Sequence, residues 1–252
     1  MERDNQQKGS SIMYEPRFYR KQGSRKLETF AVCYKETDLL IHAPVKMPEI
    51  CFNVVRRLRL KMDEYIKENP LFLKALSPIE VSPDAIEEIK EMARCSIMAG
   101  VGPMAAVAGI FAEKTGRELL KYTDEVIVEN GGDIFIKTKD DCRIGIYAGK
   151  DSPFTDRLVI KLKSSQMPLG VCSSSGMIGH SYSEGKADVV TVISRSTALA
   201  DAAATAVANW VKVKEDIDDA LSRAREIKGI SGVLIIKDDK LGVWGDLELG
   251  KK

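Results

Sequence analysis

The sequence has almost no net charge and no long hydrophobic segment, and these absences exclude several classes of protein. Of 252 residues, 38 are basic and 37 are acidic, which gives a formal net charge of +1. A chain without a charge excess has no global field that attracts nucleic acid or an acidic membrane. The most apolar segment, residues 105–112, is far shorter than the roughly 20 residues that span a bilayer. We therefore expect neither nucleic acid nor a membrane as a partner.

The sequence also lacks the cysteine pattern of a disulfide framework. Its five cysteines lie far apart and show no C-x-x-C spacing. An odd number of scattered cysteines fits a reducing compartment. Residues 1–11 are polar and lack the apolar core of a secretory signal. These features predict a cytoplasmic protein with a disordered tail over residues 1–13.

The remaining composition is that of a globular protein, with 44% hydrophobic and 30% charged residues. The length suits one large domain or two small ones, and we expect a single domain over residues 14–252, open to division into two sub-lobes. No internal repeat is visible. Helical and strand patterns are mixed without strict alternation, which predicts an α+β fold rather than a doubly wound sheet.

Hydrophobic spacing and turn residues place the main elements. Helical periodicity predicts helices over residues 49–69, 82–97, 105–122, 197–213 and 217–227. The second of these offers Ser82 as N-cap and Pro83 at its first position. Alternation and short apolar runs predict strands within 15–41 and at 126–128, 134–136, 142–147, 158–162 and 189–193, with a final hairpin at 233–236 and 242–244.

Two glycine motifs lie next to predicted helices or strands in the sequence. Gly100 and Gly102 precede Met104 and Ala105 at the start of an apolar helix. Free N–H groups and the helix dipole at such a start bind anions, although close helix packing explains the glycines equally well. The second motif runs from Asn130 through Gly131 and Gly132 to Asp133. It predicts a hairpin turn, with a plain turn favoured over a site.

Two further motifs carry side chains suited to chemistry. Asp201 and Thr205 lie four residues apart in an alanine-rich helix and so share one face, where a hard cation such as Mg²⁺ would pair with their oxygens. The alternative is an aspartate satisfied by the helix dipole. The second of these motifs, residues 170–181, contains Cys172, Ser174, Ser175, Gly176 and His180. His180 could act as acid or base and Cys172 as a nucleophile, while a small buried hydrophobe is the favoured reading of Cys172.

In this order the four motifs resemble those of the ApbE-like superfamily of FAD:protein FMN transferases, and more closely an uncharacterised-protein (UPF) branch of it. The similar region runs from Gly100 to Asn209. The resemblance implies an ApbE-like fold of mixed and antiparallel sheets flanked by helices. It also implies Mg²⁺ held by Asp201, Thr205 and a backbone carbonyl taken as that of Ala105. The metal would bridge the pyrophosphate of FAD, with FMN as the related ligand.

We expect roles for the other motif residues as well. His180 and Cys172 are the expected catalytic residues. The expected nucleotide-binding residues come from three motifs: Gly100, Gly102, Met104, Asn130, Gly131, Gly132, Asp133, Ser174, Ser175 and Gly176. The chain departs from the family where a Lys-Gly pair is replaced by Ala108-Gly109. It departs again after His180, where Ser181 to Gly185 replace an Asp-Pro, and residues 1–80 show no counterpart of the flavin-binding segment.

Three functions therefore remain open. The first is a Mg²⁺-dependent enzyme that cleaves or transfers part of a flavin- or nucleotide-like pyrophosphate. The second is persulfide handling by Cys172, since sulfur assimilation is linked to the branch that the chain resembles. The third is a binding module that keeps the fold without catalysis. A small nucleotide-like ligand is the expected partner, and a homo-oligomer is left open.

Overall fold

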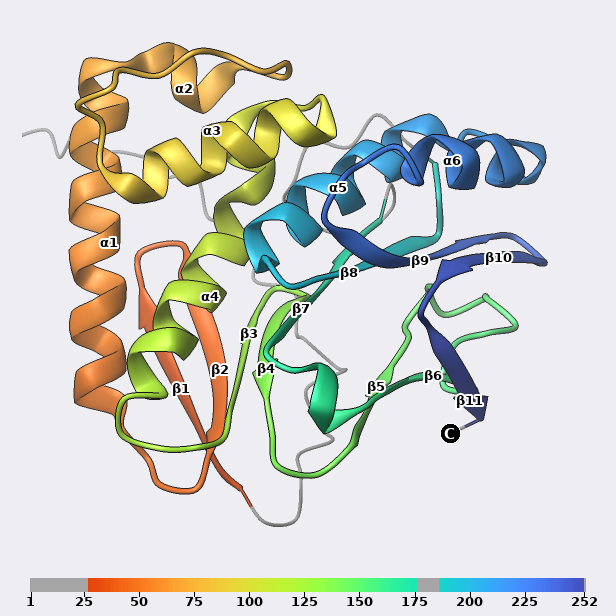
Figure 1. The fold of residues 1–252 in the computed structure, drawn as a ribbon, viewed down its shortest axis with the longest axis horizontal. Helices are drawn as coiled ribbons and strands as arrows, with labels where there is room; N and C mark the ends of the chain where they lie inside the picture. Colours follow the sequence, from red (N-terminus) through yellow and green to blue (C-terminus); the bar gives the residue numbers. More distant parts are fainter. Residues whose placement is uncertain (1–26, 176–185, 252) are drawn as a thin grey trace, which may run out of the picture.

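The protein forms three layers: helices, a large antiparallel sheet and a small second sheet (Figure 1). The computed structural model describes residues 27–175 and 186–251. The large sheet has eight strands in the order β1-β2-β3-β4-β7-β8-β9-β10 and the small sheet three in the order β11-β6-β5. All neighbouring strands are antiparallel. Antiparallel sheets flanked by helices confirm the predicted α+β class.

The strands are mostly short. In the large sheet they are β1 Glu28–Tyr34, β2 Thr37–Ala43, β3 Val126–Asn130, β4 Asp133–Lys137, β7 Leu169–Ser174, β8 Val189–Ser194, β9 Ile230–Lys237 and β10 Lys240–Gly245. In the small sheet they are β5 Cys142–Gly145, β6 Leu158–Leu162 and β11 Glu248–Lys251. Short hairpins link β1 to β2, β3 to β4 and β9 to β10, and β4 pairs with β7 after the chain has visited the small sheet.

The helices lie on one face of the large sheet (Figure 1). They are α1 Pro48–Glu68, α2 Pro70–Lys74, α3 Glu87–Ala99, α4 Val107–Leu119, α5 Thr197–Trp210 and α6 Ile217–Ala224. Within the described residues, no single helix is long and apolar enough to cross a membrane. Only α3 taken together with Pro103–Leu119 reaches that length, and the two are bent by 105°.

The large sheet is buried on both faces at β8, which explains the continuous apolar run in that strand. Val190 and Val192 face the helices, whereas Val189 and Ile193 face the small sheet. Strands that are covered on both sides have unbroken hydrophobic sequences, without alternation of apolar and polar residues. α5 packs on β7 and β8, and its alanines are buried along most of its length. The small side chains let this helix lie close to the sheet.

The second predicted helix begins later than its N-terminal signals indicate. α3 starts at Glu87, and Ser82 instead closes a local turn. Its Oγ accepts a hydrogen bond from the N–H of Asp84, and its carbonyl accepts one from Ala85. Ile86 is then extended, with φ −60° and ψ 155°. A serine followed by acid favours a turn as readily as a helix cap, and here the turn forms.

Several elements were not predicted. β7 overlaps the motif at residues 170–181, for which no strand was predicted, because its glycine and serines give no strand pattern. Pairing with β4 and β8 supplies the strand instead. β11 pairs with β6, nearly 90 residues away in sequence. The short helix α2 begins at Pro70, because proline is favoured in the first turn of a helix even where it ends the preceding one.

Candidate functional site

The starts of α4 and α5 meet over β7, and glycines make that contact possible. A Cβ atom on Gly109 would lie 2.5 Å from the carbonyl oxygen of Thr197 and 2.9 Å from the Cβ of Asp201. A Cβ atom on Gly170 in β7 would overlap the backbone of Thr197. Any larger residue would push the two helices or the strand apart. The glycines therefore bring together the motifs found at residues 100–109, 170–176 and 200–205.

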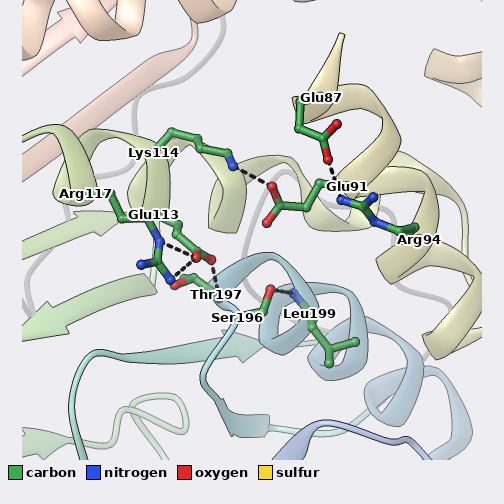
Figure 2. Close-up of polar contacts among 9 residues, drawn as sticks. All are labelled: Glu87, Glu91, Arg94, Glu113, Lys114, Arg117, Ser196, Thr197 and Leu199. Carbon is green, nitrogen blue, oxygen red and sulfur yellow. Dashed lines mark hydrogen bonds and ion pairs between the residues drawn. The ribbon is translucent and has the colours of Figure 1, made fainter. Parts of the chain in front are cut away.

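Each of the two helices carries a carboxylate that accepts a hydrogen bond from the first turn of the other. Asp201 on α5 accepts from the N–H of Gly109, with Oδ2 at 2.7 Å. Glu113 on α4 accepts from the N–H of Thr197, with Oε2 at 2.7 Å (Figure 2). Within each helix the two residues are four apart, so the bonds form two rungs one turn apart. Each carboxylate satisfies an N–H that no intrahelical carbonyl can reach and offsets the positive end of a helix.

Glu113 is held on both sides. It is 3% exposed, and its Oε1 accepts hydrogen bonds from Arg117, one turn along α4, with the Nη2 atom at 2.7 Å. The Arg117 guanidinium lies over the ring of Phe135 in β4, 5.6 Å from its centre. Ser196 caps the same end of α5 by accepting from the N–H of Leu199 at 3.2 Å. The start of α5 is thus anchored at two N–H groups (Figure 2).

Asp201 lies close to a second carboxylate, that of Asp133 at the start of β4. Burial raises the pKa of Asp201 well above its ordinary value, and the charge of Asp133 raises it further. Hydrogen bonds from the N–H groups of Gly109 and Ala108 act in the opposite direction. Within the described part of the chain, no cationic side chain contributes to this pKa. Burial and the neighbouring carboxylate therefore both favour the neutral, protonated form of Asp201.

The predicted hairpin at Asn130 is confirmed and is tied to α4. Asn130 pairs with Asp133 across the turn, and Gly131 and Gly132 have φ angles of 67° and 106°. Glycine is suited to both positions because L side chains rarely adopt these angles. The Asn130 Nδ2 atom donates to the carbonyl of Ala108 at 3.1 Å. This bond holds the start of β4, and with it Asp133, beside the start of α4.

Cys172 sits beneath the two helix starts in an environment that keeps its thiol protonated. Its side chain is fully buried, and Sγ donates to the carbonyl of Thr197 at 3.3 Å. Burial raises the pKa of the thiol well above its ordinary value, and the nearby charges of Asp133 and Asp201 raise it further. This is the setting of the small buried hydrophobe favoured from the sequence, and it opposes formation of a thiolate.

The serines that follow Cys172 in that motif lie on different faces of β7. Ser174 ends the strand on the same face as Cys172, and Ser175 follows it. Ser173 points to the opposite face, where its Oγ lies 2.9 Å from the Oγ1 of Thr191. Gly176 and His180 lie outside the described residues, so their predicted roles stay predictions.

The glycine loop before α4 differs from the expected anion site. Gly100 ends α3 with φ 73°, and the N–H groups of Gly100 and Val101 both donate to the carbonyl of Ser96. These two N–H groups are therefore engaged within the protein. A Cβ atom on Gly102 would collide with the carbonyl of Ala75, which is a contact of the packing alternative, whereas nothing lies within 4 Å of a Cβ on Gly100. The roles predicted for this loop stay predictions, and the first turn of α4 receives the protein's own Asp201.

Met104 and Ala105 lie in the short 3₁₀ helix Pro103–Ala106 between this loop and α4. The N–H of Ala105 donates to the carbonyl of Gly102 at 3.1 Å. Both residues are partly buried against the helical core. Their place directly before Ala108 and Gly109 puts them in the chain segment that leads into the Asp201 contact.

The donor chemistry around Asp201 fits the Mg²⁺ ion that the resemblance implies. Thr205, one turn along α5, is 8% exposed and lies on the same helix face as Asp201. Carboxylate and hydroxyl oxygens are ligands of hard cations, and a divalent ion beside Asp201 would favour the ionised form of its carboxylate. Among the described residues, no three His, Cys, Asp or Glu side chains are arranged to hold a metal ion. Hydroxyl and backbone oxygens would have to complete such a set.

Glu113 and its bond to Thr197 were missed from the sequence. The signal was present, because Glu113 is an acidic residue one turn after Gly109 in a helix that is otherwise apolar up to that point. A buried carboxylate in such a position requires a partner. The partner, a backbone N–H 84 residues away, is visible only in the fold.

Comparisons with known sequences cover most of the chain. A protein-family model described as "AbpE bacteria" matches residues 20–244. The UPF0280 protein MJ1526 from Methanocaldococcus jannaschii is 40% identical over 222 residues, which cover 86% of this chain and 90% of that protein. The UPF0280 protein MK0206 from Methanopyrus kandleri is 38% identical over 221 residues, which cover 85% and 89%.

Solved structures share the fold at low sequence identity. The apo form of the flavinyl transferase ApbE from Pseudomonas stutzeri aligns with a TM-score of 0.58 and 14% identity, over 87% of this chain and 94% of that chain. A variant of the flavin transferase ApbE from Vibrio cholerae aligns with a TM-score of 0.56 and 15% identity, over 87% and 97%. Both confirm the ApbE-like architecture predicted from the motifs.

Proposed function

Since the chain belongs to the UPF0280 branch of the ApbE-like superfamily, we propose that it binds a flavin or related nucleotide together with Mg²⁺ and acts on the phosphate groups. The ligand would be FAD, FMN or a similar nucleotide, and the reaction a Mg²⁺-dependent cleavage or transfer at a pyrophosphate. The observation that carries this proposal is the place of the Asp201 carboxylate at the start of α4, where it accepts from the N–H of Gly109 and lies close to Asp133.

The residues around this pair have separable tasks. Asp201 and Thr205 would hold the metal ion, with the carbonyl of Ala105 as the expected backbone ligand. The N–H of Gly109 orients the Asp201 carboxylate through Oδ2. When bound, Mg²⁺ would neutralise negative charge on a phosphoryl group as it is transferred. The turn at Asn130 and the end of β7 at Ser174 would border the nucleotide.

Ala108 makes this chemistry depend more strongly on the metal. The related family carries a lysine at this position, and alanine supplies no charge. The nearest cations on α4 are engaged elsewhere, Lys114 with Glu91 at 2.5 Å and Arg117 with Glu113. A bound phosphate would therefore rely on the metal ion rather than on a lysine for charge neutralisation.

Persulfide chemistry at Cys172 is supported less well. A sulfur nucleophile needs a thiolate, and the burial and neighbouring carboxylates of Cys172 raise the pKa of its thiol. Mass spectrometry of protein treated with an inorganic polysulfide tests this point, because a thiolate takes one sulfane sulfur from it and releases the shorter polysulfide. We expect no adduct on Cys172, and a stoichiometric adduct there would revive the sulfur alternative.

The proposal is tested by thermal unfolding with FAD or FMN, with and without Mg²⁺. We expect the nucleotide to raise the Tm only when Mg²⁺ is present, because the carboxylates and the phosphates repel each other without it. Asp201→Ala should abolish this Mg²⁺-dependent rise. Asp124→Ala is the matched control, since Asp124 is 80% exposed and pairs with Lys139 far from the site.

Activity is measured separately by chromatography of FAD incubated with the protein and Mg²⁺. Appearance of FMN and AMP, lost in Asp201→Ala, would establish cleavage. Mg²⁺-dependent binding without products would indicate a binding module. Failure of every tested flavin and nucleotide to shift the Tm in the presence of Mg²⁺ would contradict the proposal.

A further inference from the structure

The side chain of Asn130 reaches the helix layer from the end of β3. Residues of a strand alternate between the two faces of a sheet, and Val126 and Val128, on the same face as Asn130, pack into the core beneath the helices. Asn130 itself is 9% exposed. Its Nδ2 atom donates to the carbonyl oxygen of Ala108 at 3.1 Å. A carbonyl oxygen only accepts hydrogen bonds, so this contact requires the amide nitrogen of Asn130 on that side.

The carbonyl of Ala108 and the N–H of Gly109 belong to one peptide group in the first turn of α4. This peptide is trans, so its C=O and its N–H point in opposite directions. The C=O accepts from Asn130, and the N–H donates to the Oδ2 atom of Asp201 at 2.7 Å. A single peptide group therefore connects the amide of Asn130 to the carboxylate of Asp201.

The backbone that carries Asn130 is fixed on both sides. Asn130 pairs with Leu39 of β2 and with Asp133 of β4. Within the turn, the Oε1 atom of Glu129 accepts from the N–H of Gly132 at 3.0 Å. Strands on both sides leave the end of β3 little freedom to move, so the Asn130 amide meets α4 in one position.

The Asp201 carboxylate is oriented by backbone groups of α4. It accepts from the N–H groups of Gly109 and Ala108, and no side chain in the described part of the chain donates to it. Hydrogen bonds that share a peptide group polarise one another, so the bond from Asn130 strengthens the bond to Asp201. Partners that orient a metal ligand in this way affect the affinity for the metal.

We propose that Asn130 is a positioning residue that acts on Asp201 through the peptide between Ala108 and Gly109. By donating to the C=O of this peptide, Asn130 directs its N–H at the carboxylate and fixes the direction in which the carboxylate meets a cation. The effect on a cation rests on the proposed function, in which Asp201 holds Mg²⁺. The connection between the two side chains exists without a metal.

Nuclear magnetic resonance of the metal-free, full-length chain tests this connection. Asn130→Ala removes the donor to Ala108, and we expect the amide proton of Gly109 to move upfield, because its hydrogen bond to Asp201 weakens. The reverse measurement uses Asp201→Ala, in which the side-chain amide protons of Asn130 should shift. It decides the question even if Asn130→Ala fails to fold.

Two controls separate positioning from a general loss of structure. The amide proton of Thr197, which donates to Glu113 in the neighbouring rung, should keep its position in Asn130→Ala. Asn69→Ala is the matched variant, because Asn69 also donates through Nδ2 to a helix carbonyl, that of Tyr65, at 3.1 Å. Asn69 is exposed at the end of α1, so its loss should leave the amide proton of Gly109 unchanged.

Titration calorimetry with Mg²⁺ alone measures the consequence at the proposed metal site. Asn130→Ala should weaken Mg²⁺ binding about tenfold, as loss of a residue that orients a metal ligand does, and Asn69→Ala should not weaken it. If the wild-type protein binds no Mg²⁺, the proposed function fails while the resonance shifts still decide the role of Asn130. Unchanged shifts of Gly109 in Asn130→Ala and of Asn130 in Asp201→Ala, or Mg²⁺ affinity equal to that of the wild type in Asn130→Ala, would overturn the proposal.

Discussion

Two carboxylates at the candidate site, Glu113 and Asp201, show how the surroundings of a single residue set its role. Both accept a 2.7 Å hydrogen bond from the first turn of a neighbouring helix. Glu113 also has Arg117 as a cationic partner and is therefore neutralised within the protein. Asp201 lies close to Asp133 instead, and that charge raises the pKa of Asp201 further. The first arrangement stabilises the fold, and in the second a bound cation would favour the ionised carboxylate.

Glu113→Gln should lower the free energy of unfolding by about 1–3 kcal/mol, since a buried charge-assisted hydrogen bond and an ion pair are weakened together. The comparison is Glu87→Gln, which breaks the Glu87–Arg94 pair drawn in the same close-up (Figure 2). Both side chains of that pair are about 60% exposed, so no measurable change is expected. Urea denaturation monitors both variants. Equal effects would show that the bond from Glu113 to Thr197 contributes nothing specific.

At the scale of elements, the site depends on how closely α4, α5 and β7 approach one another. Gly109 and Gly170 remove the side chains that would separate them, and the alanines of α5 keep that helix close to the sheet. Asn130 then connects the β3–β4 turn to α4. The start of α4, the glycine turn and the end of β7 therefore lie close together. The hypothesis drawn from the sequence, that these segments share one pocket, requires this arrangement.

Gly109→Ala should destabilise the protein by about 1–3 kcal/mol or more, although alanine is the better helix former. The reason is that its Cβ would lie 2.5 Å from the carbonyl oxygen of Thr197. The Mg²⁺-dependent stabilisation should fall as well, because Gly109 and Asp201 would be forced apart. Gly145→Ala in β5 is the control, since nothing lies within 4 Å of a Cβ at that position. Tm values and urea midpoints that are indistinguishable for the two variants would contradict this account of the helix contact.

At the scale of the whole molecule, Asp201 links stability to pH and to metal binding. Its folded-state pKa is raised above that of the unfolded chain, so over the interval between the two values the unfolded state binds fewer protons. The contribution of Asp201 is therefore present at low pH and is lost as pH rises through the folded pKa. A metal ion binds the ionised carboxylate and should restore that stability.

We therefore expect the rise in Tm caused by Mg²⁺ to grow with pH across the range in which Asp201 ionises, and to be smallest at acidic pH. Differential scanning calorimetry across a pH series, with and without Mg²⁺, measures it. Asp201→Asn should remove both the metal effect and its pH dependence, because the amide does not titrate. A Mg²⁺ effect that is the same at every pH would place the metal elsewhere.

The predictable part of the fold followed from local chemistry. Residues 49–69 were expected to be helical and form α1, Pro48–Glu68, because apolar residues recur at helical spacing. The Asn130 turn was expected from glycines that tolerate positive φ. β7 and β11 escaped prediction because their residues carry no strand pattern and gain their conformation from distant partners. Glu113 escaped for the same reason, since its acceptor role depends on Thr197.

For the site, the identities and order of the chemical groups were readable from the chain: the aspartate and threonine one turn apart, the glycine turn and the cysteine-serine segment. Those features depend on residues within a few positions of one another, where side-chain type and backbone preference act directly. Tertiary structure alone decided that Gly102 packs against the carbonyl of Ala75, that Cys172 is buried beside two carboxylates, and that the α4 start binds Asp201. Burial and charge interactions depend on distances between segments far apart in sequence, and only the folded chain sets those distances.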